Sequence, residues 1–504
     1  MRPHRLIPAL PALLALAFLI APAGEAPAKS RPLETGIIDY EPYSGLESQL
    51  AFERTRDAGA RVVRIFVAWW AMVPEPDSSQ KPAGFNAGDP ADPGYAFAGI
   101  DAQVRGARAA GLEPMLLLSN APVWAEGTEG NKPQGVRVRG THDPSPREYA
   151  LFVRAAARRY SGNFPGVPRV RLWQAWNEPN VWANLTPQFD QDLFEPVRAG
   201  SEPVAPDIYK TLLNRFAAEV RRVHRDNVVV TGGLAPFGAA DSGFHRVAPM
   251  VFMRELLCMN SRNRPVRRRC ARPAFDIWSH HPYTEGGPTH RAQHPDNVSL
   301  GDLPRMRRLL NAAMRADQIA TKRKVKFWVT EFAWDTKPPE DRGLPLKLHA
   351  RWTSEALYRM WRNGVSLVTW FKLRDNPNNG FSDAGIAQSG LYFRCDGGLA
   401  CDEPKPTLTA FRFPFVAFRS GKKVDVWGRT PESDRRRVLV EQRRGGGWRR
   451  VARLRSDRHG IFQDRLRRRG RGPLRARLAG KSAATKRSLP FSLKVPKDRP
   501  AVIL

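Results

Sequence analysis

The sequence predicts an α/β fold, a (β/α)8 TIM barrel followed by a small all-β, sandwich-like domain. Two observations lead to this prediction. Short apolar runs alternate with amphipathic helical patterns over about the first 400 residues, as in a barrel with inserted loops. After Phe418 the helical patterns stop and short alternating runs follow. We therefore expect a leader segment at 1–28, the barrel domain at 29–418 and a basic β-sandwich-like domain at 419–504.

The leader segment has the pattern of an export signal peptide. Arg2, His4 and Arg5 form a basic start, residues 6–20 form an apolar run, and small residues follow at 21–23 and 26–28. The run is shorter than a typical membrane span. We therefore expect a secreted, extracellular protein that does not associate with a membrane after signal removal. An uncleaved anchor is the alternative interpretation.

Eight apolar, β-rich runs are the expected barrel strands, and their nearly continuous apolar character suits strands covered on both faces. They are residues 35–40, 62–68, 113–119, 170–176, 228–232, 275–280, 326–330 and 366–371. Helical patterns between them cover residues 46–58, 102–110, 147–160, 208–224, 303–321 and 346–363. An open doubly wound sheet is the alternative, but no G-x-G-x-x-G opens a helix after the first run.

The positive charge is concentrated at the C-terminal end. The chain carries a net charge of +32, and from Lys422 onward 26 Lys and Arg stand against 7 Asp and Glu. Such a segment favours anionic polymers, so we expect an anionic cell-wall polymer as its partner. Because Arg far outnumbers Lys, genome composition is an equal alternative, and a basic disordered tail is another. No nucleic-acid-binding motif accompanies the charge, so no nucleic-acid partner is expected.

The four cysteines suit an exported protein. We expect two local disulfides, Cys258–Cys270 and Cys395–Cys401, since each closes a short loop. No C-x-x-C motif occurs and no His lies close to either pair. A metal site is therefore not expected, and neither is a cofactor.

Two glutamates stand where a barrel places reactive groups. Glu178 lies in Trp-Asn-Glu-Pro-Asn just past the fourth run, and Glu331 lies in Trp-Val-Thr-Glu-Phe at the end of the seventh. Active sites of such barrels lie at the carboxyl ends of the strands. Two carboxyl groups facing each other across the barrel mouth are what cleavage of a glycosidic bond requires: one protonates the leaving oxygen, and the other attacks or stabilises the sugar cation.

With these motifs the chain resembles the clan of retaining (β/α)8 glycoside hydrolases that keep Asn-Glu on strand four and Glu on strand seven. It looks most like family 39, the β-xylosidase, iduronidase and exopolysaccharide-hydrolase family, with family 5 cellulases second. The resemblance covers roughly residues 35–418. It implies that Glu178 is the acid/base and Glu331 the nucleophile. It also implies that Asn177 binds the sugar 2-hydroxyl and that Arg64 keeps Glu331 ionised.

Further substrate-binding residues follow from the same resemblance. His281 and Tyr283 correspond to the His and Tyr that contact the nucleophile and the substrate, and Trp370 to the Trp that forms the floor beneath the cleaved sugar. We add Trp124, in the loop after the third run, as a candidate for stacking on a sugar. Core packing is the alternative for each aromatic residue, and an ordinary salt bridge is the alternative for Arg64.

The predicted function is therefore that of a secreted retaining glycosidase that cleaves O-glycosidic bonds of a polysaccharide or oligosaccharide by double displacement, and we expect these bonds to be β-linked. The alternative is a non-catalytic carbohydrate- or cell-wall-binding protein on the same barrel. Such a protein would normally have lost one glutamate, and both are present here.

Overall fold

The computed structural model describes residues 30–127, 139–191, 197–198, 200–238, 245–266, 270–377, 388–480 and 486–501. The expected signal peptide at 1–28 lies outside these residues. Among the described helices, none is long and apolar enough to cross a membrane.

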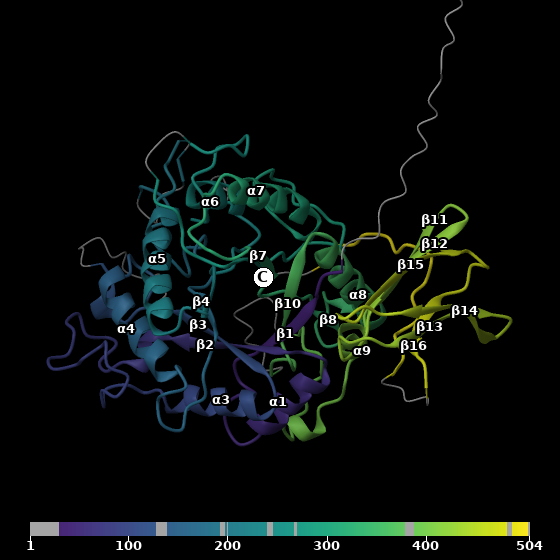
Figure 1. Cartoon of the computed structure of the whole chain (residues 1–504), viewed down its shortest axis with the longest axis horizontal. Helices are drawn as coiled ribbons and strands as arrows, with labels where there is room; N and C mark the ends of the chain where they lie inside the picture. Colours follow the sequence, from purple (N-terminus) through teal and green to yellow (C-terminus); the bar gives the residue numbers. More distant parts are fainter. Residues whose placement is uncertain are drawn as a thin grey trace, which may run out of the picture.

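Eight parallel strands close into a barrel in the order β1-β10-β7-β6-β5-β4-β3-β2, which confirms the predicted fold class and excludes the open sheet (Figure 1). The strands are β1 (Glu34–Ile38), β2 (Val62–Ala68), β3 (Glu113–Ser119), β4 (Leu172–Ala175), β5 (Val228–Val230), β6 (Ile277–His280), β7 (Lys326–Val329) and β10 (Val365–Phe371). Each falls within or next to one of the eight predicted runs. The barrel closes because β1 pairs with both β2 and β10.

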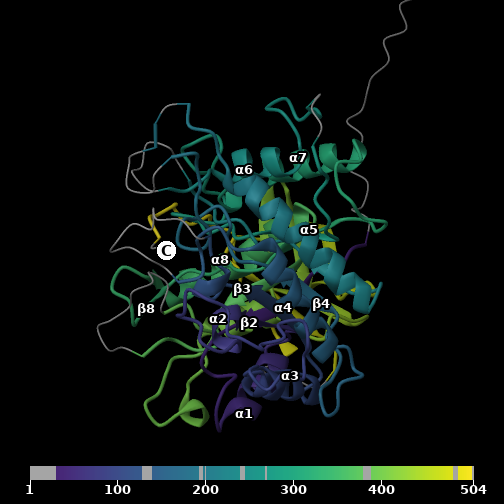
Figure 2. The ribbon, with the colours of Figure 1, turned by 90° about the vertical axis from the view of Figure 1, so that its left-hand side faces the viewer.

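Helices cover the outside of the barrel, with α4 and α5 beside each other in Figure 2. The predicted helical patterns correspond to α1 (Ser48–Asp57), α3 (Ala98–Ala109), α4 (Pro146–Arg159), α5 (Ala205–Val223), α7 (Leu303–Arg315) and α8 (Leu346–Arg362). Three more helices, α2 (Trp69–Met72), α6 (Pro249–Leu256) and α9 (Pro406–Arg412), are short and were not predicted. A helix of one or two turns has too few residues to show a clear 3.6-residue period.

Alternation along the strands separates the barrel interior from the helix layer. Val62, Met115, Val230, Ile277, Trp328 and Leu367 form a small buried cluster of their own, contributed by six of the strands. We take this cluster as the filling of the barrel. Because successive side chains point to opposite faces, Arg64 and Phe66 share the inward face of β2 with Val62. In the same way, Thr369 and Phe371 share the inward face of β10 with Leu367.

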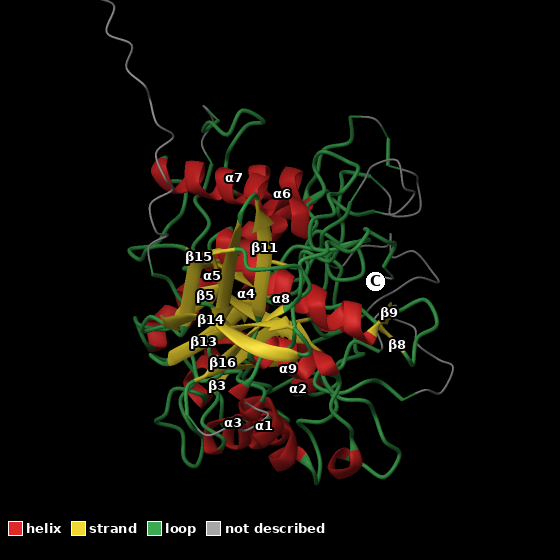
Figure 3. Cartoon of the chain, turned by 90° about the vertical axis from the view of Figure 1, so that its right-hand side faces the viewer, coloured by secondary structure: helices red, strands yellow, loops and turns green. Residues whose placement is uncertain are grey.

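The C-terminal part is all-β. It holds two three-stranded antiparallel sheets, β11-β12-β15 and β14-β13-β16 (Figure 3). Their strands are β11 (Phe415–Ser420), β12 (Lys423–Arg429), β13 (Arg437–Arg444), β14 (Gly447–Arg455), β15 (Ile461–Arg467) and β16 (Leu474–Leu478). These strands contradict the disordered-tail interpretation for the residues described. The small two-stranded sheet β8 (Thr336–Lys337) and β9 (Leu344–Pro345) belongs to the barrel loops.

The all-β part packs closely against the barrel. Trp427 of β12 lies against Trp361 of α8, with ring centroids 5.5 Å apart. Arg429 is fully buried, and its guanidinium donates to the Leu33 carbonyl and the Thr35 hydroxyl at the start of β1, both at 3.0 Å. The far C-terminal segment also returns to the barrel, where the Ala501 amide donates to the Glu285 carbonyl at 2.9 Å.

Both predicted disulfides are present. Cys258 pairs with Cys270, and Cys395 pairs with Cys401. The first closes a 12-residue separation after α6, and the second a 6-residue separation in the segment that leads to α9.

Candidate active site

Glu331 follows β7 and is held by a buried arginine. Arg64, on the inward face of β2, has no exposed surface, and its Nη1 lies 2.5 Å from Glu331 Oε1. The other donors of this guanidinium are also used. Nε donates to Gln174 Oε1 at 2.7 Å, and Nη2 donates to Asn177 Oδ1 at 2.8 Å. Arg64 therefore links the ends of β4 and β7 and fixes the direction of the Glu331 carboxylate.

Tyr283 binds the other oxygen of this carboxylate, donating from its hydroxyl to Glu331 Oε2 at 3.2 Å. Burial raises the pKa of Glu331, but the charges of His281 and Arg64 and the hydrogen bonds from Arg64 and Tyr283 lower it, and the net shift is downward. The same surroundings raise the pKa of Tyr283, through burial first and the charge of Glu331 second, so that its hydroxyl keeps its proton. Glu331 is thus a carboxylate at neutral pH.

Glu178 projects from a tight turn after β4. The strand ends at Ala175, and both Trp176 (φ 66°) and Glu178 (φ 37°) adopt positive φ angles that non-glycine residues rarely take. The turn is held because the Trp176 amide donates to Leu118 O and the Glu178 amide to Gly232 O, both at 3.0 Å. Strained backbone of this kind is concentrated at functional sites, where the surrounding structure maintains it.

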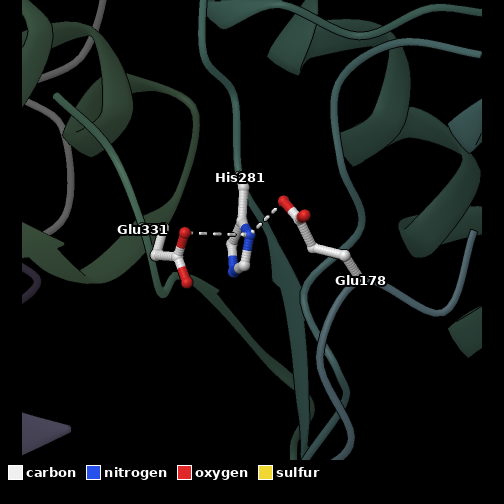
Figure 4. A group of neighbouring side chains, drawn as sticks. All are labelled: Glu178, His281 and Glu331. Carbon is white, nitrogen blue, oxygen red and sulfur yellow. Dashed lines mark hydrogen bonds and ion pairs between the residues drawn. The ribbon is translucent and has the colours of Figure 1, made fainter. Parts of the chain in front are cut away.

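His281 lies between the two carboxylates (Figure 4). Its Nδ1 is 2.7 Å from Glu178 Oε1 and 3.8 Å from Glu331 Oε2, while its Nε2 is 2.9 Å from Thr330 Oγ1. When Glu178 is ionised, Nδ1–H donates to it. When Glu178 is protonated, its proton points to Nδ1 and Nε2–H donates to Thr330. The contact with Glu178 therefore persists in both protonation states of that carboxyl group.

His280 has a different role from its neighbour. It lies on the outward face of β6, fully buried, with Nε2 at 2.8 Å from Val298 O. Burial lowers its pKa to about 3, so it is neutral at ordinary pH. Of the two adjacent histidines in the sequence, only His281 lies next to the carboxylates of Glu178 and Glu331.

Several supporting residues were not predicted from the sequence. Gln174, on the inward face of β4, receives Arg64 and donates from Nε2 to Thr330 Oγ1 at 3.1 Å. Ser279 Oγ lies 2.5 Å from the same Thr330 hydroxyl. Gly233 (φ 66°) lies so close to His281 that a Cβ there would come within 2.2 Å of Nε2. The sequence offered two signals for these residues. One is the polar Gln174 within an apolar run, and the other is the Gly-Gly pair that begins with the last residue of the fifth run.

The spacing of the three groups invites comparison with a metal site. One ligand atom from each of Glu178, His281 and Glu331 lies within 4.8 Å of the others. The surroundings suit a metal ion poorly, because both oxygens of Glu331 are already bound by Arg64 and Tyr283. A cation placed there would also face the guanidinium at short range, where the repulsion is strong. The close carboxylate pair is better suited to acid–base and nucleophilic chemistry.

Of the eight site residues named from the sequence, the structure brings six together: Arg64, Asn177, Glu178, His281, Tyr283 and Glu331. Trp370 is not among them. It lies on the outward face of β10, almost fully buried, with its ring against Phe411 of α9 and His349 of α8 and its Nε1 bound to Ser389 O at 2.9 Å. It therefore does not form a floor beneath the carboxylates. The next residue of β10, Phe371, is the one that points into the barrel at this end of the strand.

Trp124 also lies apart from the carboxylates. It is half-buried in the loop after β3, and its ring packs edge-on against Trp69, with centroids 6.0 Å apart. Lys81 Nζ lies 5.6 Å from the ring centroid, and Trp124 Nε1 reaches Pro74 O at 3.4 Å. These contacts belong to loop packing beside the barrel mouth.

Comparison with known proteins gives distant structural likenesses. No family model matches the chain, and no curated protein matches it. A family 39 glycoside hydrolase from Bacteroides cellulosilyticus WH2 is 17% identical, with 87% of this chain and 79% of that chain covered and a TM-score of 0.49. A glucosidase from Croceicoccus marinus is 12% identical, with 87% and 93% covered and a TM-score of 0.46. A family 30 endoxylanase from Clostridium papyrosolvens C71 is 10% identical, with 87% and 94% covered and a TM-score of 0.45. Likenesses this distant do not define a reaction, so the function has to be inferred from the side chains of the site.

Proposed function

We propose that this chain is a secreted glycoside hydrolase that cleaves O-glycosidic bonds of an oligosaccharide or polysaccharide with retention of anomeric configuration. One observation carries the proposal: the carboxyl groups of Glu178 and Glu331 approach within 4.8 Å at the barrel mouth, and Glu331 is held ionised by Arg64. Retaining enzymes keep their two carboxyl groups about 5–5.5 Å apart, whereas inverting enzymes leave room for a water between them.

In the proposed first step, Glu331 attacks the anomeric carbon while Glu178 gives its proton to the glycosidic oxygen. The bond between that oxygen and the anomeric carbon breaks, and a covalent glycosyl ester forms on Glu331. In the second step Glu178, now ionised, takes a proton from a water molecule. The resulting hydroxide attacks the anomeric carbon and releases Glu331. Two inversions give net retention.

The neighbouring residues support these two roles. Arg64 and Tyr283 together orient the Glu331 carboxylate and keep it free of a proton, which attack requires. His281 holds Glu178 in place through both halves of the cycle, because its ring accommodates either protonation state of that group. Asn177 is fixed by Arg64 next to Glu178, and we assign its amide to the 2-hydroxyl of the bound sugar.

For the C-terminal part we propose a role in binding an anionic polymer such as a cell-wall component. Arg449, Arg450, Arg453 and Arg455 of β14 are exposed, which supports this proposal. Binding of this kind weakens as salt concentration rises. Co-sedimentation with anionic wall material over a range of salt concentrations tests it, and salt-independent binding would contradict it.

The catalytic proposal is tested by screening the mature protein against aryl β-glycosides and β-linked polysaccharides. The expected result is hydrolysis of at least one substrate by the wild type and by Glu432→Gln, a control at an exposed carboxylate of the all-β part. Glu331→Gln should be inactive on the same substrate. A folded wild type that binds a polysaccharide but hydrolyses none would instead support a non-catalytic carbohydrate-binding protein.

A further inference from the structure

We infer that Tyr40, together with the neighbouring rings of Phe66 and Phe371, forms a stacking surface for a pyranose ring on the glycone side of the cleaved bond. This inference rests on the proposed function and extends it, because the two rings among the six residues gathered around the carboxylates, His281 and Tyr283, are buried. It also assigns a role to residues that the sequence motifs did not single out.

The three rings form one corner of the barrel mouth. Tyr40 and Phe66 meet edge to face, with centroids 6.0 Å apart and an interplanar angle of 84°. Tyr40 and Phe371 meet similarly, at 6.2 Å and 71°. Tyr40 is 49% exposed, one of three large apolar residues with such exposure in the described part of the chain, and both phenylalanines are partly exposed. Because the three rings contact one another, they form a contiguous apolar surface rather than a single exposed side chain, and such surfaces mark ligand-binding sites.

The corner lies on the inward side of the barrel, close to the carboxylates. Phe66 is two residues beyond Arg64 on the inward face of β2, and Phe371 ends the inward face of β10. Tyr40 follows β1, which lies between those two strands. Desolvation by the surrounding protein raises the pKa of Tyr40, and the charge of Glu331 raises it further and more strongly than that of Glu178. The ring contacts and the strand order therefore place Tyr40 at the barrel mouth between the ends of β2 and β10, on the side of the site that holds Arg64.

The position of this corner is fixed by Asp39. Its Oδ1 accepts from the Tyr40 amide at 2.8 Å, and its Oδ2 accepts from the Leu373 amide at 3.1 Å. Lys372 Nζ lies 3.3 Å from the same carboxylate. The residue before Tyr40 is thus tied to the residues after Phe371, so the two rings keep their relative placement without a ligand. A preformed surface loses little conformational entropy on binding.

A sugar ring is the occupant that this corner and its surroundings fit. A pyranose presents C–H bonds on its faces, and an aromatic face attracts them while its hydroxyls stay free for polar partners. The polar partners lie across the mouth: β5 is opposite β1 in the closed barrel, and His281 and Tyr283 follow the neighbouring β6. The family resemblance had assigned an aromatic face to Trp370, but Trp370 points outward. We infer that Tyr40 supplies an aromatic face at the barrel mouth instead.

The test compares Tyr40→Ala, Tyr40→Phe and Leu46→Ala on the best aryl glycoside of the screen. Leu46 is a fully exposed residue in the same loop after β1 and serves as the matched control. Loss of a stacking ring should raise KM by about tenfold with a small change in kcat, because the contact is made in the ground state and the transition state alike. Tyr40→Phe and Leu46→Ala should keep the wild-type KM. Equal thermal unfolding temperatures show that the fold is intact.

Polysaccharide affinity electrophoresis of the same variants separates this inference from the proposed function. An active wild type whose KM is unchanged by Tyr40→Ala overturns the stacking surface and leaves the glycosidase proposal standing. An inactive wild type that is retarded by a polysaccharide, with retardation lost in Tyr40→Ala, overturns the hydrolase and supports the surface. A wild type that neither hydrolyses nor binds any carbohydrate of the panel overturns both.

Discussion

Arg64 and Glu331 face each other across the barrel interior, with 2.5 Å between Nη1 and Oε1 and no exposed surface on the arginine. A buried ion pair of this kind contributes little net stability, since both charges lose their water. Its value lies in the chemistry, because it holds a carboxylate ionised and aimed at the barrel mouth. Breaking it by removing Arg64 would leave a buried charge without a partner, so more conservative changes are better tests of the site.

The division of labour between the two glutamates can be tested with Glu178→Ala. Glycosides with poor leaving groups should lose about 10²–10⁴-fold in rate, because in the proposed mechanism Glu178 supplies the proton that their leaving oxygen needs. An activated aryl glycoside should still form the glycosyl ester, and added azide should then speed turnover. Initial rates with and without azide check this. Azide rescue that gives a product of inverted configuration would show that Glu178 is instead the nucleophile.

The pH dependence should report the environment of Glu331. Its pKa is lowered in the folded protein, so it stays ionised, and the enzyme active, as the pH falls below the ordinary range of a glutamate. Tyr283→Phe removes one hydrogen bond to the carboxylate and raises that pKa. The acid limb of the kcat/KM profile should therefore move to higher pH. An acid limb that stays in place would mean that another group controls it.

Gly233→Ala should inactivate the site while leaving the fold intact. A Cβ at this position would lie 2.2 Å from His281 Nε2, so the imidazole has to move and Glu178 loses its partner. Gly111→Ala is a matched control, since Gly111 also has a positive φ (77°) but has open space around its Cβ position. We expect a fall in kcat of about 10²-fold for Gly233→Ala alone, in line with the cost of displacing a group that positions a catalytic one. Equal loss in both variants would point to backbone strain instead.

Trp370→Phe should affect stability and leave substrate binding unchanged. The Trp370 ring packs between the barrel and the helices α8 and α9, so a smaller ring leaves a cavity there and should cost about 1–3 kcal/mol. Thermal unfolding measures the loss, and KM on the aryl glycoside should equal that of the wild type. A raised KM at unchanged stability would restore the role that the family resemblance gave to this tryptophan.

Strong local patterns explain what the sequence could predict. Eight apolar runs and six helical patterns were enough for the barrel, and the position of Glu178 and Glu331 at the ends of two runs was enough to pair them across its mouth. Trp370 was assigned to the site through the family resemblance alone. Counting alternate residues from Leu367 would instead have placed Phe371 inward and Trp370 outward.

The remaining parts of the site depend on contacts between residues far apart in the chain. Gln174 and Thr330 stand 156 residues apart and carry no local signal, yet their side chains meet beneath His281. In the sequence, nothing distinguishes Tyr40 from other aromatic residues at the ends of apolar runs. Its placement depends on the pairing of β1 with β2 and β10 and on the tie from Asp39 to Leu373, and neither has a local pattern.

The stereochemistry of the first-formed product tests the central claim most directly. If Glu331 is the nucleophile and Glu178 the acid/base, proton NMR during hydrolysis of an aryl β-glycoside should show the β-anomer of the released sugar first, followed by slow mutarotation. The α-anomer appearing first would mean that water attacks directly, and it would contradict the double displacement proposed for this pair of carboxylates.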